Sequence, residues 1–157
     1  MMIDEIEHKL RKNKTIEDVL EKYDWKKFEI VISEIFLANG FSTKQNFRFK
    51  VGRRYEIDVV ASNGNKIFCV DCKWWNKGRY KKSGLKNAVR LQEIRVKEFA
   101  KLLNDNILAR KSFKVDKKFK TIPLLVTLQD EDMIKENETF VVPVWKLNKF
   151  INEIYPF

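Results

Sequence analysis

A chain of 157 residues with 44% hydrophobic and 13% aromatic residues can bury a core without disulfides, which excludes a disordered chain or a cysteine-rich miniprotein. The 32 Lys and Arg residues outnumber the 22 Asp and Glu residues and give a formal charge of +10. Such an excess favours a polyanionic partner such as nucleic acid, although a Lys-rich surface that only confers solubility explains it equally well.

The sequence has no positively charged start followed by an apolar segment, as a signal peptide would have, and no apolar run of about 18 residues. We therefore predict a cytoplasmic protein with no membrane association and with reduced cysteines. Cys69 and Cys72 lie three apart in a predicted strand and so point to opposite faces. Because His8 is the single histidine, they indicate buried apolar residues rather than a zinc site.

The first strong element in chain order is a helix over residues 25–39, with Asp24 as N-cap and Gly40 at the C′ position. Its apolar residues form one stripe at helical spacing. Glu29 lies at the margin of that stripe and is expected to face the domain without full burial. Glu34 lies on the far side and is expected to meet water.

A strand over 41–51 is followed by a hairpin over 54–73, because two alternating runs flank an Asn-Gly pair. With the loop at Asn63-Gly64, or over residues 62–65, Asp58 is expected opposite Cys69 and Glu56 opposite Asp71.

In that register Asp58, Asp71 and Lys73 share one face, and the two carboxylates are diagonal neighbours roughly 7–8 Å apart at Cα. Such a group could hold a hard divalent cation. It could equally be a solvated face of the sheet, so the rest of the chain has to decide.

The segment from Lys73 to Arg90 contains seven basic residues and no acid. Residues 74–84 are predicted to form a loop in which basic residues alternate with aromatic ones, a pattern that suits a phosphate backbone with bases or sugars nearby. A mobile solvated loop is the alternative. The candidate nucleic-acid-binding residues are Arg53, Arg54, Lys77, Arg79, Lys81 and Lys82.

The remaining elements complete an α/β pattern. A long helix over 85–104 carries Gln92 at the centre of its apolar face, either as a core amide bonded to the backbone or as an amide placed beside the acidic hairpin. A basic connector (110–120) leads to a buried strand over 121–128, with Pro123 expected near its start or at an edge. A helical turn or loop (130–137), a short strand (139–142) and a terminal helix (145–154) follow.

This order predicts one mixed sheet with helices on both faces. It also predicts one domain (1–157), with peripheral helices in 1–24 and a core in 25–154.

This order of elements, with its acidic hairpin, resembles the PD-(D/E)xK nucleases of the restriction-endonuclease-like class, above all the Mrr-like and archaeal Holliday-junction-resolvase branches. The resemblance runs from about 25 to 150. It rests on Phe28-Glu29 ahead of Gly40-Phe41, on Glu56-Ile57-Asp58, on Val70-Asp71-Cys72-Lys73, and on the helix containing Gln92.

The resemblance implies a metal-dependent endonuclease that hydrolyses DNA, with Asp58 and Asp71 binding Mg²⁺ (or Mn²⁺), Glu29 completing the metal site directly or through water, and Lys73 positioning or activating the attacking water. Gln92 matches a glutamine that some members carry on the following helix. No proline precedes Asp58, and Asp71 stands where relatives often have Glu. Glu34 is a weaker candidate for the helix acid, and Glu56 matches no family role.

Three other functions fit the sequence. A resolvase of four-way junctions would ignore linear duplex and act as a homodimer. Cleavage of RNA resembling that of tRNA-splicing endonucleases is disfavoured, because those enzymes use a histidine-centred site and His8 lies outside every motif. A non-catalytic nucleic-acid-binding module on the same fold would bind DNA in a salt-dependent way without binding metal.

Overall fold

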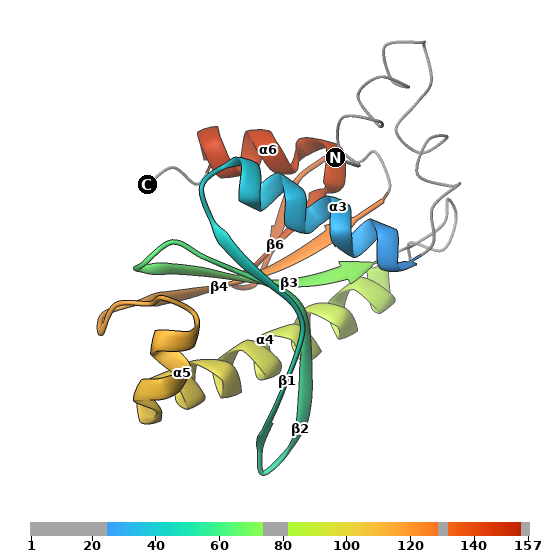
Figure 1. Ribbon diagram of the computed structural model, residues 1–157. Helices are drawn as coiled ribbons and strands as arrows, with labels where there is room; N and C mark the ends of the chain where they lie inside the picture. Colours follow the sequence, from blue (N-terminus) through green and yellow to red (C-terminus); the bar gives the residue numbers. More distant parts are fainter. Residues whose placement is uncertain (1–24, 74–81, 129–131, 155–157) are drawn as a thin grey trace.

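The computed structural model describes residues 25–73, 82–128 and 132–154. Six strands form one mixed sheet in the order β1-β2-β3-β4-β6-β5. The helices α3 and α6 cover one face, and α4 and α5 cover the other (Figure 1). The predicted α/β class, with one mixed sheet flanked by helices on both faces, is confirmed. The peripheral helices expected before residue 25 lie outside the described residues.

The strands are β1 (Ser42–Val51), β2 (Arg53–Ser62), β3 (Lys66–Lys73), β4 (Lys120–Thr127), β5 (Ile134–Glu136) and β6 (Thr139–Pro143). The helices are α3 (Trp25–Ala38), α4 (Lys82–Asp105), α5 (Ile107–Ser112) and α6 (Leu147–Lys149), the last flanked by the helical turns Val144–Lys146 and Phe150–Ile154.

The helix α3 ends where the sequence predicts. Gly40 has φ +86°, a conformation that glycine adopts without strain. The Phe41 N–H donates to the Phe36 carbonyl at 3.1 Å, and the Gly40 N–H donates to the Leu37 carbonyl at 3.1 Å. This is the Schellman arrangement, which satisfies carbonyls at the helix end and turns the chain into β1.

The β2–β3 register differs from the predicted one. Val59 pairs with Val70, and Val60 with Cys69, whereas Asp58 was expected opposite Cys69. The two-residue loop is Gly64-Asn65, because the Asn63 N–H donates to the Lys66 carbonyl at 3.1 Å and Gly64 has φ +90°. A glycine at the first loop position is what a type II′ turn requires. The register is thus shifted by two residues, which keeps the paired residues 59–62 and 67–70 on their predicted faces.

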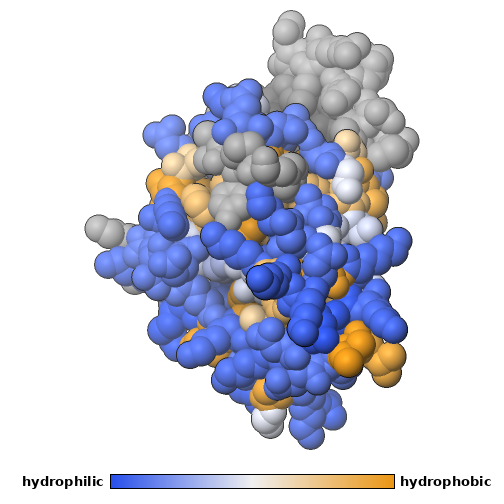
Figure 2. All heavy atoms as spheres, turned by 90° about the vertical axis from the view of Figure 1, so that its left-hand side faces the viewer, coloured by the Kyte–Doolittle hydropathy of each residue, from blue (hydrophilic) through white to orange (hydrophobic). Residues whose placement is uncertain are grey.

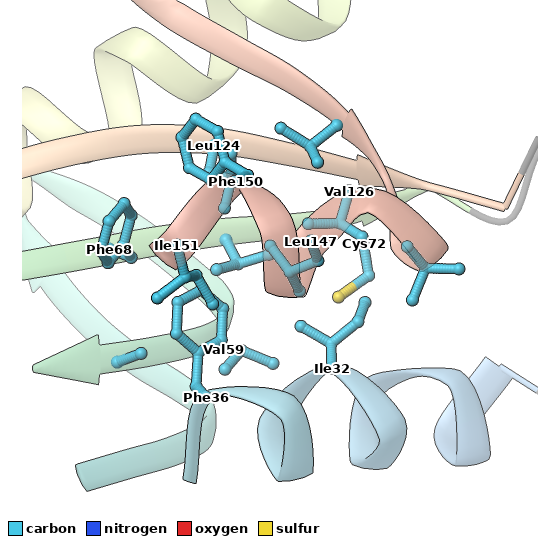
Figure 3. Packing of buried hydrophobic residues seen from close by; sticks show 14 of the residues in the cluster. Ile32, Phe36, Val59, Phe68, Cys72, Leu124, Val126, Leu147, Phe150 and Ile151 are labelled. Atoms are coloured by element: carbon cyan, nitrogen blue, oxygen red, sulfur yellow. The ribbon is translucent and has the colours of Figure 1, made fainter. Parts of the chain in front are cut away.

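Hydrophobic clusters fill the space between the sheet and its helices on both faces. On one side, Ile32 and Phe36 of α3 meet Leu147, Phe150 and Ile151 around the middle strands, and the Cys72 side chain points into this cluster (Figure 3). On the other side, Cys69 packs with Val96, Phe99 and Leu103 of α4. The two buried cysteines therefore lie on opposite faces of the sheet, as predicted.

Four local predictions are corrected. The helix α4 begins at Lys82, so residues 82–84 belong to it and not to a loop. The helix α5 begins before the basic connector and extends into it, and its N-cap Asn106 accepts a hydrogen bond from the Ala109 N–H. Residues 134–136 form β5, which pairs with β6. Pro123 lies in the inner strand β4, but pairing with β6 begins only at Leu124, so its missing N–H leaves no gap in that ladder.

One face of the protein is mainly polar. Figure 2 shows a face dominated by hydrophilic residues, with hydrophobic residues scattered among them. Among the described helices, none is both long and apolar enough to span a membrane.

Candidate active site

The sheet brings two carboxyl groups together. The β2–β3 ladder ends at the pair Val59–Val70, and continuing its register by one pair sets Asp58 across from Asp71. Beyond the ladder, the Asp58 Oδ2 atom accepts a hydrogen bond from the Cys72 N–H at 2.8 Å. The Asp58 side chain thus satisfies a backbone donor where strand pairing stops. The two carboxyl groups share a hydrogen bond, so they are closer than the predicted diagonal arrangement.

Burial raises the pKa of the Asp58 carboxyl to about 7, and the negative charge of Asp71 and a hydrogen bond between the two carboxyl groups act in the same direction. Glu29 adds a smaller repulsion, while the hydrogen bond from the Cys72 N–H lowers the pKa. Without a cation, the protein therefore holds a proton in this site up to about neutral pH. Crowded carboxylates of this kind are typical of functional sites.

The strand β2 rotates about its own axis at Asp58. Ile57 joins the cluster on the α4 side, whereas Val59, two residues later, joins the cluster on the α3 side. On β1, the position across from Asp58 is Asn46, which has φ +52° and is missing from the ladder. This interruption lies next to the change of face at Asp58, whose carboxyl group is affected by the charges of both Asp71 and Glu29.

Glu29 approaches the pair from α3. Only 1% of the residue is exposed, so it is buried more completely than the sequence predicts. Lys26, one turn earlier, places its Nζ 3.8 Å from Glu29 Oε2 and donates to Asn46 Oδ1 at 3.3 Å. The charge of Glu29 reaches Asp58, and Lys26 links α3 to the irregular position on β1. Glu34 is partly exposed.

Asp71 is flanked by two cations. Its Oδ2 atom lies 3.0 Å from Lys73 Nζ and 4.0 Å from Arg95 Nη1. Lys73 is the predicted lysine, two residues further along β3 on the same face. Arg95 was not predicted, because its place depends on how α4 lies across the sheet. The local signal is its spacing of three residues from Gln92, which puts both on one face of α4.

Gln92 is fully buried beneath Arg95. Its Nε2 atom donates to the Cys69 carbonyl at 2.8 Å and, more weakly, to the Leu124 carbonyl at 3.4 Å. Its Oε1 atom accepts a hydrogen bond from Arg95 Nη1. The amide is thus bonded to the backbone of β3 and β4, as expected of a core glutamine. It is linked to Asp71 through Arg95.

Glu56 is separate from the pair. It faces Arg48 across β1–β2 and forms an ion pair with it at 2.9 Å. Its expected place opposite Asp71 is therefore wrong. Burial raises the pKa of the thiols of Cys69 and Cys72, so both remain protonated and take no part in nucleophilic chemistry.

The basic candidates are only partly described. Arg53 and Arg54 are exposed near the tip of the β1–β2 hairpin, and the Arg53 guanidinium lies 5.3 Å from the Tyr55 ring centre. Lys77, Arg79 and Lys81 lie outside the described residues. Lys82 is the first residue of α4, and its side chain is not described.

The donor set suits a hard cation such as Mg²⁺. In residues 25–73, 82–128 and 132–154, no three His, Cys, Asp or Glu side chains converge into a complete metal site. Two carboxyl groups do meet, and Mg²⁺ is usually held by one or two carboxylates, with waters and substrate phosphate as its other ligands. Burial and the charge of Asp71 raise the pKa of Asp58, and a bound cation would stabilise the ionised carboxylate against both effects.

Residues 20–109 match a family model, Mrr_cat, which is described as a restriction endonuclease. The chain belongs to this family. The match extends from before α3 into α5 and so includes every acidic candidate together with Lys73, Gln92 and Arg95. The family assignment supports a restriction-endonuclease-like nuclease and agrees with the mixed sheet.

Two individual proteins are similar to this restriction-endonuclease family member. An uncharacterized protein of Archaeoglobus fulgidus is 30% identical over 132 residues, which cover 83% of this chain and 92% of that protein. A crystal structure of a protein of unknown function is 20% identical and covers 83% of this chain, with a TM-score of 0.43. The chain spans 59% of the length of that second protein, and this similarity is too low to support a conclusion.

Proposed function

We propose that this protein is a Mg²⁺-dependent endonuclease that hydrolyses phosphodiester bonds in DNA, with Mn²⁺ able to replace Mg²⁺. The observation that supports the proposal is the pair Asp58 and Asp71, whose carboxyl groups interact at the end of the β2–β3 ladder. Lys73 Nζ lies 3.0 Å from Asp71 Oδ2. A solvated face of the sheet would leave such carboxylates apart and hydrated.

In this proposal Asp58 and Asp71 are the metal ligands, and Glu29 contributes its negative charge and completes the site directly or through water. A bound divalent cation would neutralise charge on the phosphate and lower the pKa of a water molecule. The Lys73 ammonium, a compact donor beside Asp71, orients the attacking water or stabilises charge that develops on the phosphate. Burial of Glu29 and Asp71 strengthens these electrostatic effects.

Replacing Asp71 with alanine tests the function directly. We expect wild type to cleave at least one of plasmid, linear duplex, branched or single-stranded DNA with Mg²⁺ or Mn²⁺, and Asp71→Ala to cleave none. Asp132→Ala is the matched control, because the Asp132 side chain is 99% exposed. Identical product patterns for wild type and Asp71→Ala would rule out the proposed site. Preference for branched DNA would identify a resolvase.

The β1–β2 arm, residues 47–57, offers the proposed enzyme a surface for the DNA backbone. Figure 1 shows this hairpin extending beyond the rest of the sheet. Side chains on its α4 side, such as Phe49 and Ile57, join the core, whereas Arg48, Lys50 and Arg54 on the other side are exposed. Arg54 lies four residues from Asp58, or about 13 Å along an extended strand, which is a distance of about four nucleotides.

Removing Arg53 and Arg54, two of the three arginines of the arm, is expected to weaken DNA binding without affecting the chemistry. The double variant Arg53→Gln/Arg54→Gln should lower the slope of log Kd against log salt by about 2, since each phosphate contact contributes about 0.9. The rate constant at saturating enzyme should stay within about threefold. Fluorescence anisotropy in Ca²⁺ across a KCl series measures the slope. Lys101→Gln/Lys149→Gln, which removes two exposed charges elsewhere, should leave it unchanged, and an equal loss in this control would contradict an arm-specific role.

Metal binding by the proposed enzyme should depend on pH. Asp58, whose pKa is about 7, must lose its proton to bind a cation. Mn²⁺ affinity is therefore expected to rise about tenfold per unit up to pH 7 and to level off above it. Electron paramagnetic resonance of free Mn²⁺ from pH 5.5 to 8.5 measures this, with Asp58→Asn as control. An affinity that is constant from pH 5.5 to 7 would contradict the assignment of Asp58 as a ligand.

A further inference from the structure

Arg95 stands beside the candidate site as a second cation next to Asp71. Its side chain is 23% exposed, and its Nη1 atom lies 4.0 Å from Asp71 Oδ2. Lys73 Nζ contacts the same oxygen at 3.0 Å. Because Asp71 already has a close cationic partner, pairing with Asp71 alone does not explain why a second positive charge is held there.

Gln92 fixes the position of that charge. The buried amide is anchored through Nε2 to the Cys69 carbonyl of β3, and its Oε1 atom accepts from Arg95 Nη1. Since Cys69 precedes Asp71 by two residues on the same strand, the anchor ties the guanidinium to the strand that carries the acid. An arginine held by a buried amide loses little side-chain freedom when it binds a ligand.

The guanidinium retains donors for a ligand. A guanidinium has five N–H groups in a rigid fork, and its contacts with Gln92 and Asp71 both use Nη1. Arginine binds phosphate through two parallel hydrogen bonds, which is the geometry this fork provides. The ligand class that fits a half-buried arginine next to paired carboxylates and a lysine is a phosphate group.

We propose that Arg95 binds a non-bridging oxygen of the DNA phosphate in the active site and that Gln92 is a positioning residue acting through Arg95. This proposal rests on the proposed nuclease function. It separates the two helix residues by role: Arg95 contacts substrate, and Gln92 sets its orientation. It also explains why a fully buried glutamine lies on the same helical face as an accessible arginine.

The variants Arg95→Met and Arg95→Lys test the contact, and Lys101→Met removes a charge from the exposed side of α4 as a control. DNA affinity in Ca²⁺ is measured across a KCl series, Mn²⁺ affinity is measured without DNA, and kcat and KM are measured separately. We expect Arg95→Met to reduce the salt slope by about 0.9, raise KM and lower kcat at least tenfold, and leave Mn²⁺ affinity within twofold. Arg95→Lys should restore the slope but recover kcat only partly, because lysine lacks the fork.

Gln92→Met tests the positioning role. We expect it to keep the salt slope, because the charge of Arg95 remains, and to lower kcat about tenfold, because the guanidinium is no longer held. Urea unfolding of each variant confirms that it is folded. Should Gln92→Met fail to fold, the two Arg95 variants still decide whether Arg95 contacts the phosphate.

The outcomes separate the two proposals. Wild type without metal-dependent cleavage of any DNA overturns the nuclease function, and the Arg95 proposal with it. An active wild type in which Arg95→Met behaves like Lys101→Met overturns only the Arg95 proposal. Loss of Mn²⁺ affinity in Arg95→Met with an unchanged salt slope also overturns the Arg95 proposal. Arg95 would then support metal binding through Asp71 and would not bind the phosphate.

Discussion

Replacing Asp58 with asparagine is expected to make the metal-free protein more stable while abolishing cleavage. The Asp58 carboxyl has a pKa of about 7 in the folded protein, against 3.8 as its ordinary value. Between these values the folded protein holds more protons than the unfolded chain, so its stability falls as the pH rises, and above pH 7 the full cost remains. Asparagine carries no charge and keeps an oxygen that can accept the Cys72 N–H.

At pH 8 the gain in the free energy of unfolding should be about 2–4 kcal/mol, since each pKa unit corresponds to about 1.36 kcal/mol. At pH 4 it should nearly vanish. Cleavage should fall about 10³-fold or more, because a bound cation is worth several kcal/mol in the transition state. Urea unfolding at both pH values and single-turnover cleavage measure the two effects, with Asp132→Asn as control. Equal stability of Asp58→Asn and wild type at pH 8 would show that neither burial nor the charge of Asp71 destabilises the ionised Asp58 carboxylate.

Replacing Lys73 with methionine is expected to affect the rate and spare binding. The ammonium lies beside Asp71 and is 29% exposed, so it is accessible to substrate while partly desolvated. Loss of one positioned donor at a developing charge typically lowers the rate about 10²–10³-fold. Mn²⁺ affinity should be unchanged or higher, because removing a cation beside Asp71 lessens its repulsion of the metal.

Single-turnover cleavage, Mn²⁺ affinity and DNA affinity in Ca²⁺ measure these properties of Lys73→Met separately. Lys97→Met, which removes an exposed lysine of α4, is the control for charge alone. Lys73→Arg should recover little of the rate, since a planar guanidinium does not reproduce a compact point charge. A Lys73→Met enzyme that cleaves within threefold of wild type would exclude a chemical role for Lys73.

The sequence predicts those parts of the fold that local patterns determine. The apolar stripe of α3 and its end at Gly40 are local features, and the structure confirms them. The alternation expected of the hairpin strands is not confirmed, because residues 67–72 of β3 are all buried and β2 changes face at Asp58. The register of β2–β3 is less determined, because an Asn-Gly pair can enter a two-residue loop in two ways. The shift is by an even number of residues, and Asp58 and Asp71 still interact although β2 changes face at Asp58.

Features that depend on tertiary contacts could not be predicted in the same way. The three-residue strand β5 carries no pattern of its own and exists by pairing with β6. The position of Arg95 near Asp71 depends on how α4 packs against β3. Full burial of Glu29 likewise depends on the depth at which α3 packs on the sheet.

The central claim is that the paired carboxylates form a metal site, and a crystal structure of the protein soaked in Mn²⁺ tests it most directly. We predict an anomalous difference peak between Asp58 and Asp71, with oxygen ligands from both carboxylates, and no peak there in crystals of Asp71→Ala. A protein that cleaves DNA with Mn²⁺ yet shows no peak between these two residues, or binds the metal elsewhere, would contradict the account.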